Sequence, residues 1–184
     1  MQDSWLSDGW ALVAGRRIGL GGEFNEPLVI QYAGSLDALA QRLEADGWRR
    51  PPHWSVKSAT GFVEGKTSPD ELPTLPRTHN GRYAALALIR DDPNGGTGGK
   101  RWVLRFWPTS YIVDANGKIL SLYAGGLLRE EILHPLGEFS STMVDLPAPA
   151  LADNPVTGFP GAVVRTREDG TQTVLVPDLA SLAD

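Results

Sequence analysis

The stretch Arg101-Trp102-Val103-Leu104-Arg105-Phe106-Trp107 belongs to one of the two clearest predicted β-strands, which begins at Lys100 and ends at Trp107. Side chains of a strand point alternately to its two faces, so Trp102, Leu104 and Phe106 share one face. Because these three are large and apolar, we expect that face to lie on the hydrophobic core. Val103, Arg105 and Trp107 share the other face, which we expect to present Arg105 beside Trp107.

Further strands are predicted on both sides of this segment. Residues 83–90 form the partner of an antiparallel hairpin, and the glycine-rich stretch 91–99 connects the two strands. A second hairpin is expected at 110–123, because Asn116-Gly117 is the strongest short-range hairpin signal. A third is expected at 162–176, around Asp169-Gly170. Residues 127–135 fit either a further strand or a short helix.

Helical patterns occur mainly in the first half of the chain. Ser35 is a good N-cap, and Leu36, Leu39, Ala40 and Leu43 recur at the spacing of one helix face. Gly47 suits the C-terminal end of this helix, and Arg42 falls on its solvent side. Weaker helical patterns follow Ser55 and cover 68–71. The resulting prediction is the α+β class: a largely antiparallel sheet built from hairpins, with two or three short helices packed on one face.

The length of 184 residues suits one domain with an appended segment. We expect a main domain at residues 1–146. Between Pro147 and Pro160 the composition shifts towards Pro, Ala, Asn and Gly, which is typical of a linker. Residues 147–184 are therefore predicted to be a linker and a C-terminal hairpin extension packed on the same domain.

The charge distribution limits the partners. The net charge of −5 argues against a general nucleic-acid binder, which must neutralise many phosphates. The segment 77–107 is nevertheless basic, with six basic residues against two acidic ones and a local charge of +4, so the rest of the chain carries −9. A positive field within an acidic protein favours a small anion or an anionic partner surface.

The sequence lacks the residues and motifs of several further classes of protein and site. With no cysteine there is no disulfide, no thiolate zinc site and no thiol nucleophile. No apolar run approaches the roughly 18 to 20 residues of a transmembrane helix, so we expect this chain by itself to be soluble, in a compartment that the sequence leaves open. His53, His79 and His134 show no metal-binding spacing, and no nucleophile-elbow motif is present. We expect no catalytic residue, no metal and no cofactor.

The candidate binding residues lie at a turn-rich corner, Leu75-Pro76-Arg77-Thr78-His79-Asn80-Gly81-Arg82, and on the strand that follows it. Guanidinium groups bind carboxylate or phosphate bidentately, so Arg77, His79, Arg82, Arg105 and Trp107 are the predicted binding set. Two alternatives remain. The arginines can instead pair with Glu130, Glu131 or Glu138, and His79 can bond a backbone carbonyl and hold the turn in place.

Four motifs in this order resemble the LssY C-terminal domain family: Tyr32-Ala33-Gly34-Ser35-Leu36, 48–54, 75–82 and Val103-Leu104-Arg105-Phe106-Trp107. The resemblance runs from about Arg16 to about Leu136. It implies a bacterial soluble domain, often found behind a membrane-embedded portion of the phosphatidic-acid-phosphatase or DedA-like type, with no attached activity. This chain has Asn80 where many relatives are expected to carry aspartate, and residues after Pro147 lie outside the resemblance.

These observations lead to three functional hypotheses. The first is a non-catalytic accessory or sensing domain of a bacterial envelope system, which binds an anionic ligand or partner through the arginine-rich corner. The second is a small phosphoester hydrolase that uses His79 with Arg77 and Arg105. The third is a purely structural docking domain, whose tryptophan-rich sheet face docks on a neighbouring domain or on another copy of the chain.

Overall fold

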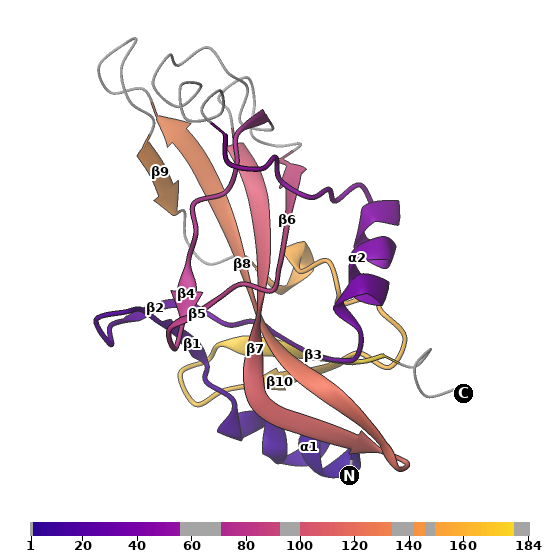
Figure 1. Cartoon of the computed structure of the whole chain (residues 1–184). Coiled ribbons are helices and arrows are strands. Elements are labelled where there is room, and N and C mark those ends of the chain that lie inside the picture. Colours follow the sequence, from indigo (N-terminus) through magenta and orange to yellow (C-terminus); the bar gives the residue numbers. More distant parts are fainter. Residues whose placement is uncertain (1, 56–70, 93–99, 134–141, 146–149, 179–184) are drawn as a thin grey trace.

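The computed structural model describes residues 2–55, 71–92, 100–133, 142–145 and 150–178. Its central feature is a long antiparallel hairpin of β7 (Lys100–Ala115) and β8 (Lys118–Leu133), each 16 residues long. The hairpin turns at Asn116 and Gly117, whose φ angles of 56° and 87° give the tight turn that the dipeptide predicts. Figure 1 shows this hairpin running the length of the molecule.

The strands predicted at 100–107 and 110–114 are therefore one continuous strand. Pairing between β7 and β8 is irregular between Pro108 and Ile112, and it resumes on the far side. Thr109 bridges the irregularity, because its Oγ1 donates to Leu122 O at 2.7 Å and accepts from Tyr111 N at 3.1 Å. The open alternative at 127–135 is also resolved, since β8 continues to Leu133.

The hairpin is the middle of a seven-stranded sheet with the order β10-β11-β3-β8-β7-β6, in which β9 also pairs with β8. The remaining strands are β3 (Ile30–Ala33), β6 (Leu86–Asp91), β9 (Thr142–Asp145), β10 (Val163–Thr166) and β11 (Gln172–Pro177). β11 runs parallel to β3, with Val174 opposite Ile30, while the other neighbouring pairs are antiparallel. The C-terminal hairpin thus extends the main sheet.

The α+β prediction is wrong, because the structure is mostly β, with 46% strand and 16% helix around one large mixed sheet. The excess of strand comes largely from the long hairpin, whose second strand continues to Leu133, and the parallel pairing of β11 with β3 makes the sheet mixed. Only two α-helices occur among the described residues, α1 (Gln2–Ser7) and α2 (Leu36–Ala45). The helix expected after Ser55 falls at residues outside the described ones, and so do all residues but Glu71 of the helix expected at 68–71.

Helix α2 forms as its sequence predicts. Ser35 caps it by accepting a hydrogen bond from Ala38 N at 3.4 Å, and Gly47 follows it with a φ of 87°. Leu39, Ala40 and Leu43 are buried against the face of the sheet that carries Trp102, Leu104 and Phe106. This is the main core of the protein, as the alternation in β7 predicts.

The opposite face of the sheet has its own apolar cluster. Trp5 from α1 and Trp10 from the 3-10 helix Gly9–Leu12 pack there with residues of the hairpin and of β3. Gln31 ties both tryptophans to the sheet, since its Oε1 accepts from Trp5 Nε1 at 2.8 Å and its Nε2 donates to Trp10 O at 2.9 Å. All four residues of β3 are consequently buried.

Two small hairpins lie beside the sheet (Figure 1). One consists of β1 (Arg16–Ile18) and β2 (Phe24–Pro27), and the other consists of β4 (Thr78–His79) and β5 (Arg82–Tyr83). A short 3-10 helix, Leu151–Asp153, precedes the C-terminal hairpin.

Candidate functional site

The arginine-rich face of β7 is covered by the chain itself. Residues 72–77, hereafter the strap, lie over it and present four backbone carbonyls to its side chains. Arg101 donates to Leu72 O at 2.6 Å and to Pro73 O at 3.2 Å. Arg105 donates to Leu75 O at 3.2 Å, and Trp107 Nε1 donates to Arg77 O at 3.1 Å. Three of the four side chains on this face of β7 between Arg101 and Trp107 therefore hold the strap in place.

Glu130 pairs with both arginines beneath the strap. It lies opposite Arg101 in the β7–β8 pairing, and its Oε2 accepts from Arg101 Nε and Nη2, each at 3.2 Å. Its Oε1 accepts from Arg105 Nη2 at 3.2 Å. The three side chains are between 0% and 2% exposed. Burial lowers the pKa of Arg105, and the adjacent Glu130 charge opposes this shift, so the buried guanidinium depends on its carboxylate partner.

The prediction that Arg105 and Trp107 are presented on an open face is wrong. Both side chains are at most 2% exposed, and the covering strap is the physical reason. The alternative pairing of Arg105 with Glu130 is confirmed. Arg105 Nη1 is a buried nitrogen with no hydrogen-bond partner among the described residues, whereas Nη2 donates to both Leu75 O and Glu130 Oε1.

Arg77 and His79 are likewise bound within the fold. Arg77 pairs with Glu26 at 3.3 Å, and Glu26 also accepts from Arg17 Nε at 2.7 Å. His79 is 5% exposed, and its Nδ1 accepts a hydrogen bond from Ile18 N at 3.1 Å. The histidine thus joins β4 to β1, although its partner is an amide donor where the sequence led us to expect a carbonyl.

Arg82 differs from the other four predicted residues. It is exposed, and no hydrogen bond or ion pair is recorded for it among the described residues. The predicted set is therefore split between a scaffold of three buried residues and the partly buried Arg77, and one solvent-facing arginine. Glu138 lies outside the described residues.

Burial and the nearby Arg17 charge lower the pKa of His79 below its ordinary value of 6.5, while Glu26 opposes the shift. The unfolded chain therefore binds a proton at a higher pH than the folded protein does. The stability that the neutral ring contributes is present above pH 6.5 and is lost as the pH falls towards the lowered folded pKa. We expect the free energy of unfolding, measured with urea, to decrease between pH 7.5 and 5.5.

In a His79→Asn variant, whose side-chain oxygen can still accept from Ile18 N, this pH dependence should be smaller. The exposed His53→Asn variant is the matched control and should keep it. An unchanged pH dependence in His79→Asn would contradict the assignment of a neutral, buried histidine.

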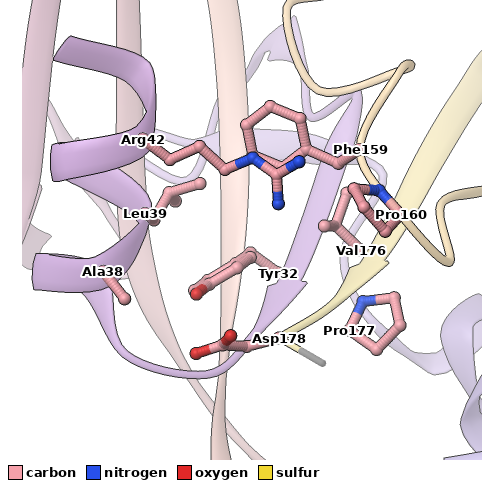
Figure 2. A pocket seen from close by; sticks show the side chains of 9 residues that line it. All are labelled: Tyr32, Ala38, Leu39, Arg42, Phe159, Pro160, Val176, Pro177 and Asp178. Atoms are coloured by element: carbon pink, nitrogen blue, oxygen red, sulfur yellow. The ribbon is translucent and has the colours of Figure 1, made fainter. Parts of the chain in front are cut away.

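A pocket of about 310 Å³ lies between α2 and the C-terminal strand (Figure 2). This volume is at the lower end of the range of roughly 300–1,000 Å³ that small-molecule sites occupy. Helix α2 and β3 provide one side, and residues after 158 provide the other. Its lining consists of Tyr32, Ala38, Leu39, Arg42, Phe159, Pro160, Val176, Pro177 and Asp178.

The cation of this pocket is Arg42. Its guanidinium lies over the ring of Phe159 at 3.9 Å from the centroid, as Figure 2 shows. The side chain is exposed, and no hydrogen bond or ion pair is recorded for it among the described residues. Stacking uses the face of the guanidinium plane, so the N–H groups at its edge stay available to an oxyanion.

Tyr32 and Asp178 form the polar end of the pocket. The Tyr32 hydroxyl donates to Ser35 O at 3.0 Å, and the Asp178 carboxylate accepts from Ser35 N at 3.4 Å. Burial, with the charge and hydrogen bonding of Asp178, raises the pKa of Tyr32, so the phenol is neutral at physiological pH. Gly34 is required here, because a Cβ at its φ of 155° would overlap Asp178 and crowd the Tyr32 hydroxyl.

Sequence reasoning did not identify this pocket. It placed Arg42 on the solvent side of its helix, which is where the residue lies, but nothing in the local pattern links Arg42 to Phe159 or Asp178. Pairing of β11 with β3 brings Asp178 to the beginning of α2, since Asp178 N donates to Ala33 O at 2.9 Å.

A second pocket, also about 310 Å³, lies near the start of β3 and the C-terminal hairpin turn, and its one charged lining residue is Arg16. Arg16 donates to Asn25 O at 2.9 Å.

Within the described residues, no group of three or more histidine and carboxylate side chains is placed to hold a metal ion. None of the described helices combines the length and apolar character needed to cross a membrane.

The chain matches the family model described as LssY C-terminus over residues 11–133. The match covers the four motifs of the sequence, the strap, the long hairpin and one side of the pocket at α2. No curated protein and no solved structure matches the sequence. Because the family model spans more than half of the 184 residues, this chain belongs to the LssY C-terminus family.

Proposed function

We propose that this chain is a non-catalytic sensing domain that binds a small anionic ligand in the pocket between α2 and β11. Its anion-binding group is Arg42, and the apolar side chains around it receive the rest of the ligand. The domain serves a bacterial envelope system as an accessory to a membrane-embedded phosphatase-like or DedA-like portion. Family membership supports this setting, and the pocket supports the binding.

The observation that carries the proposal is the position of the Arg42 guanidinium and the availability of its N–H donors. Its guanidinium is oriented by Phe159, lies at the pocket and has no recorded hydrogen-bond or ion-pair partner among the described residues. Arginine with free edge donors is the group that binds carboxylate or phosphate bidentately. By contrast, Arg77 and Arg105 of the corner already bind Glu26 and Glu130. We therefore place the anion site at α2 and not at the corner.

The test is calorimetric titration of the whole chain with 3-phenylpropanoate and with phenyl phosphate. Replacing Arg42 with glutamine removes a charge-assisted interaction of about 1.5–3 kcal/mol, so we expect at least a tenfold weaker Kd for the anion that binds. Arg82→Gln is the matched control, because it removes an exposed arginine that has no recorded partner.

Equal affinities in the wild type and Arg42→Gln would remove the pocket from consideration. A loss in Arg82→Gln alone would return the site to the corner. If neither probe binds the wild-type protein, the proposal of an aromatic carboxylate or phosphate site fails.

The hydrolase hypothesis receives less support from the geometry. His79 Nδ1 accepts from a backbone amide, and Arg105 is 2% exposed beneath the strap. A general base has to reach the proton that it removes, and charge stabilisation has to reach the reacting group. Turnover of a phosphoester substrate that disappears in His79→Asn would favour the hydrolase over the sensing domain.

The docking hypothesis also loses its proposed surface. It relied on a tryptophan-rich sheet face, yet Trp102 and Trp107 are 9% and 1% exposed. Both tryptophans belong to the apolar clusters that hold the sheet.

A further inference from the structure

We propose that the ligand of the α2 pocket is a zwitterion, namely an α-amino acid with an apolar side chain, whose carboxylate meets Arg42 and whose ammonium meets Asp178. The inference rests on the proposed function, since it uses the same pocket and the same arginine. It adds the ammonium group of the ligand and specifies the apolar side chain that lies between the walls of the pocket.

The pocket carries opposite charges at two places. Arg42 projects from α2 above Tyr32, and Asp178 lies below Tyr32 at the end of β11, as Figure 2 shows. A ligand beside Tyr32 therefore meets a cation at one end and an anion at the other.

The carboxylate of Asp178 disfavours a ligand that is only an anion. Asp178 is 9% exposed, so its charge is weakly screened by solvent. A simple carboxylate at Arg42 would put a second negative charge into the same cavity of about 310 Å³. An ammonium group on the ligand turns this repulsion into attraction, because opposite charges at short range favour each other's ionised form.

Asp178 also has the capacity to accept further hydrogen bonds. A carboxylate offers about four lone-pair sites, and an ammonium group has three donors. The recorded bond from Ser35 N at 3.4 Å and the interaction with Tyr32 hold the carboxylate in place. The backbone amide of Ser35 and the side chain of Tyr32 thus position the acceptor before a ligand arrives, which reduces the entropic cost of binding.

The walls select an apolar side chain of limited size. Leu39, Val176 and the ring of Phe159 face the cavity, together with two prolines. A cavity of about 310 Å³ accommodates one amino acid and excludes a long peptide or a polyanion. Five of the nine lining residues lie beyond residue 133, where the family match ends, so the selectivity belongs to the C-terminal segment of this chain.

The test compares three probes in calorimetric titrations of the full chain at pH 7. L-phenylalanine has both charged groups, 3-phenylpropanoate lacks the ammonium group, and 2-phenylethylamine lacks the carboxylate. We expect L-phenylalanine to bind at least about tenfold more tightly than either of the others, which corresponds to about 1.4 kcal/mol. In Asp178→Asn this preference over 3-phenylpropanoate should disappear, whereas the exposed Glu168→Gln control should keep it.

The outcomes separate this inference from the proposed function. If 3-phenylpropanoate binds as tightly as L-phenylalanine to the wild type, the zwitterion inference is overturned and the anion site stands. If none of the three probes binds, the zwitterion inference is overturned, and the proposed function is overturned with it if phenyl phosphate does not bind either. If Asp178→Asn does not fold, the comparison of the three probes on the wild type decides the matter by itself.

Discussion

Glu130→Gln is expected to lower the free energy of unfolding by about 3–5 kcal/mol, because it leaves two buried guanidinium groups without their shared carboxylate. Arg101 and Arg105 both bind Glu130 at 3.2 Å, and none of the three side chains is more than 2% exposed. A loss of this size is a large part of the 5–15 kcal/mol that stabilises a typical domain. Urea denaturation followed by tryptophan fluorescence measures it.

The neighbouring Glu131→Gln variant is the control for this prediction. Glu131 pairs with Lys100 at 3.7 Å, and both side chains are partly exposed, so its loss should cost at most about 1 kcal/mol. Similar, small losses in both variants would contradict the buried network.

The second large effect is expected for Arg101→Met. This substitution removes the donors for Leu72 O and Pro73 O and one of the two cations at Glu130. Each unsatisfied buried acceptor costs about 1–3 kcal/mol, so we expect a total loss of about 3–5 kcal/mol. We also expect faster amide hydrogen exchange in a peptide that covers the strap, since two of its four anchoring bonds are gone.

Arg90→Met provides the comparison from the other face of the sheet. Arg90 stacks on Trp48 at 4.8 Å from the ring, and the loss of such a contact costs about 0.5–1 kcal/mol. The strap should then exchange as it does in the wild type. Unchanged exchange of the strap in Arg101→Met would show that Arg101 does not hold it.

Local signals explain the parts of the fold that the sequence predicts well. The cap at Ser35, the apolar spacing of α2 and the Asn116-Gly117 turn each depend on neighbouring residues, and each is confirmed. The length of β7 was missed because Pro108 resembles a strand end, although the strand continues after an irregular pairing. Pairing of Val174 with Ile30 joins distant segments, and no local pattern specifies it.

Prediction of the candidate site is limited in the same way, because local patterns do not specify contacts between distant segments. Alternation along β7 correctly groups Arg105 with Trp107, but it does not say what covers that face. The strap is bound through its backbone carbonyls, and because every residue has one, no pattern of residue types predicts these contacts. Arg42 was correctly placed in solvent, yet its pocket also needs Phe159 and Asp178, which come from the C-terminal segment.

An NMR titration of the ¹⁵N-labelled chain with 3-phenylpropanoate tests the central claim most directly, because it locates the bound anion residue by residue. We predict amide shift changes at Tyr32, along α2 and at Phe159 and Val176, with no change at Arg82. Shift changes confined to the corner at residues 77–82, with α2 and β11 unaffected, would contradict the account.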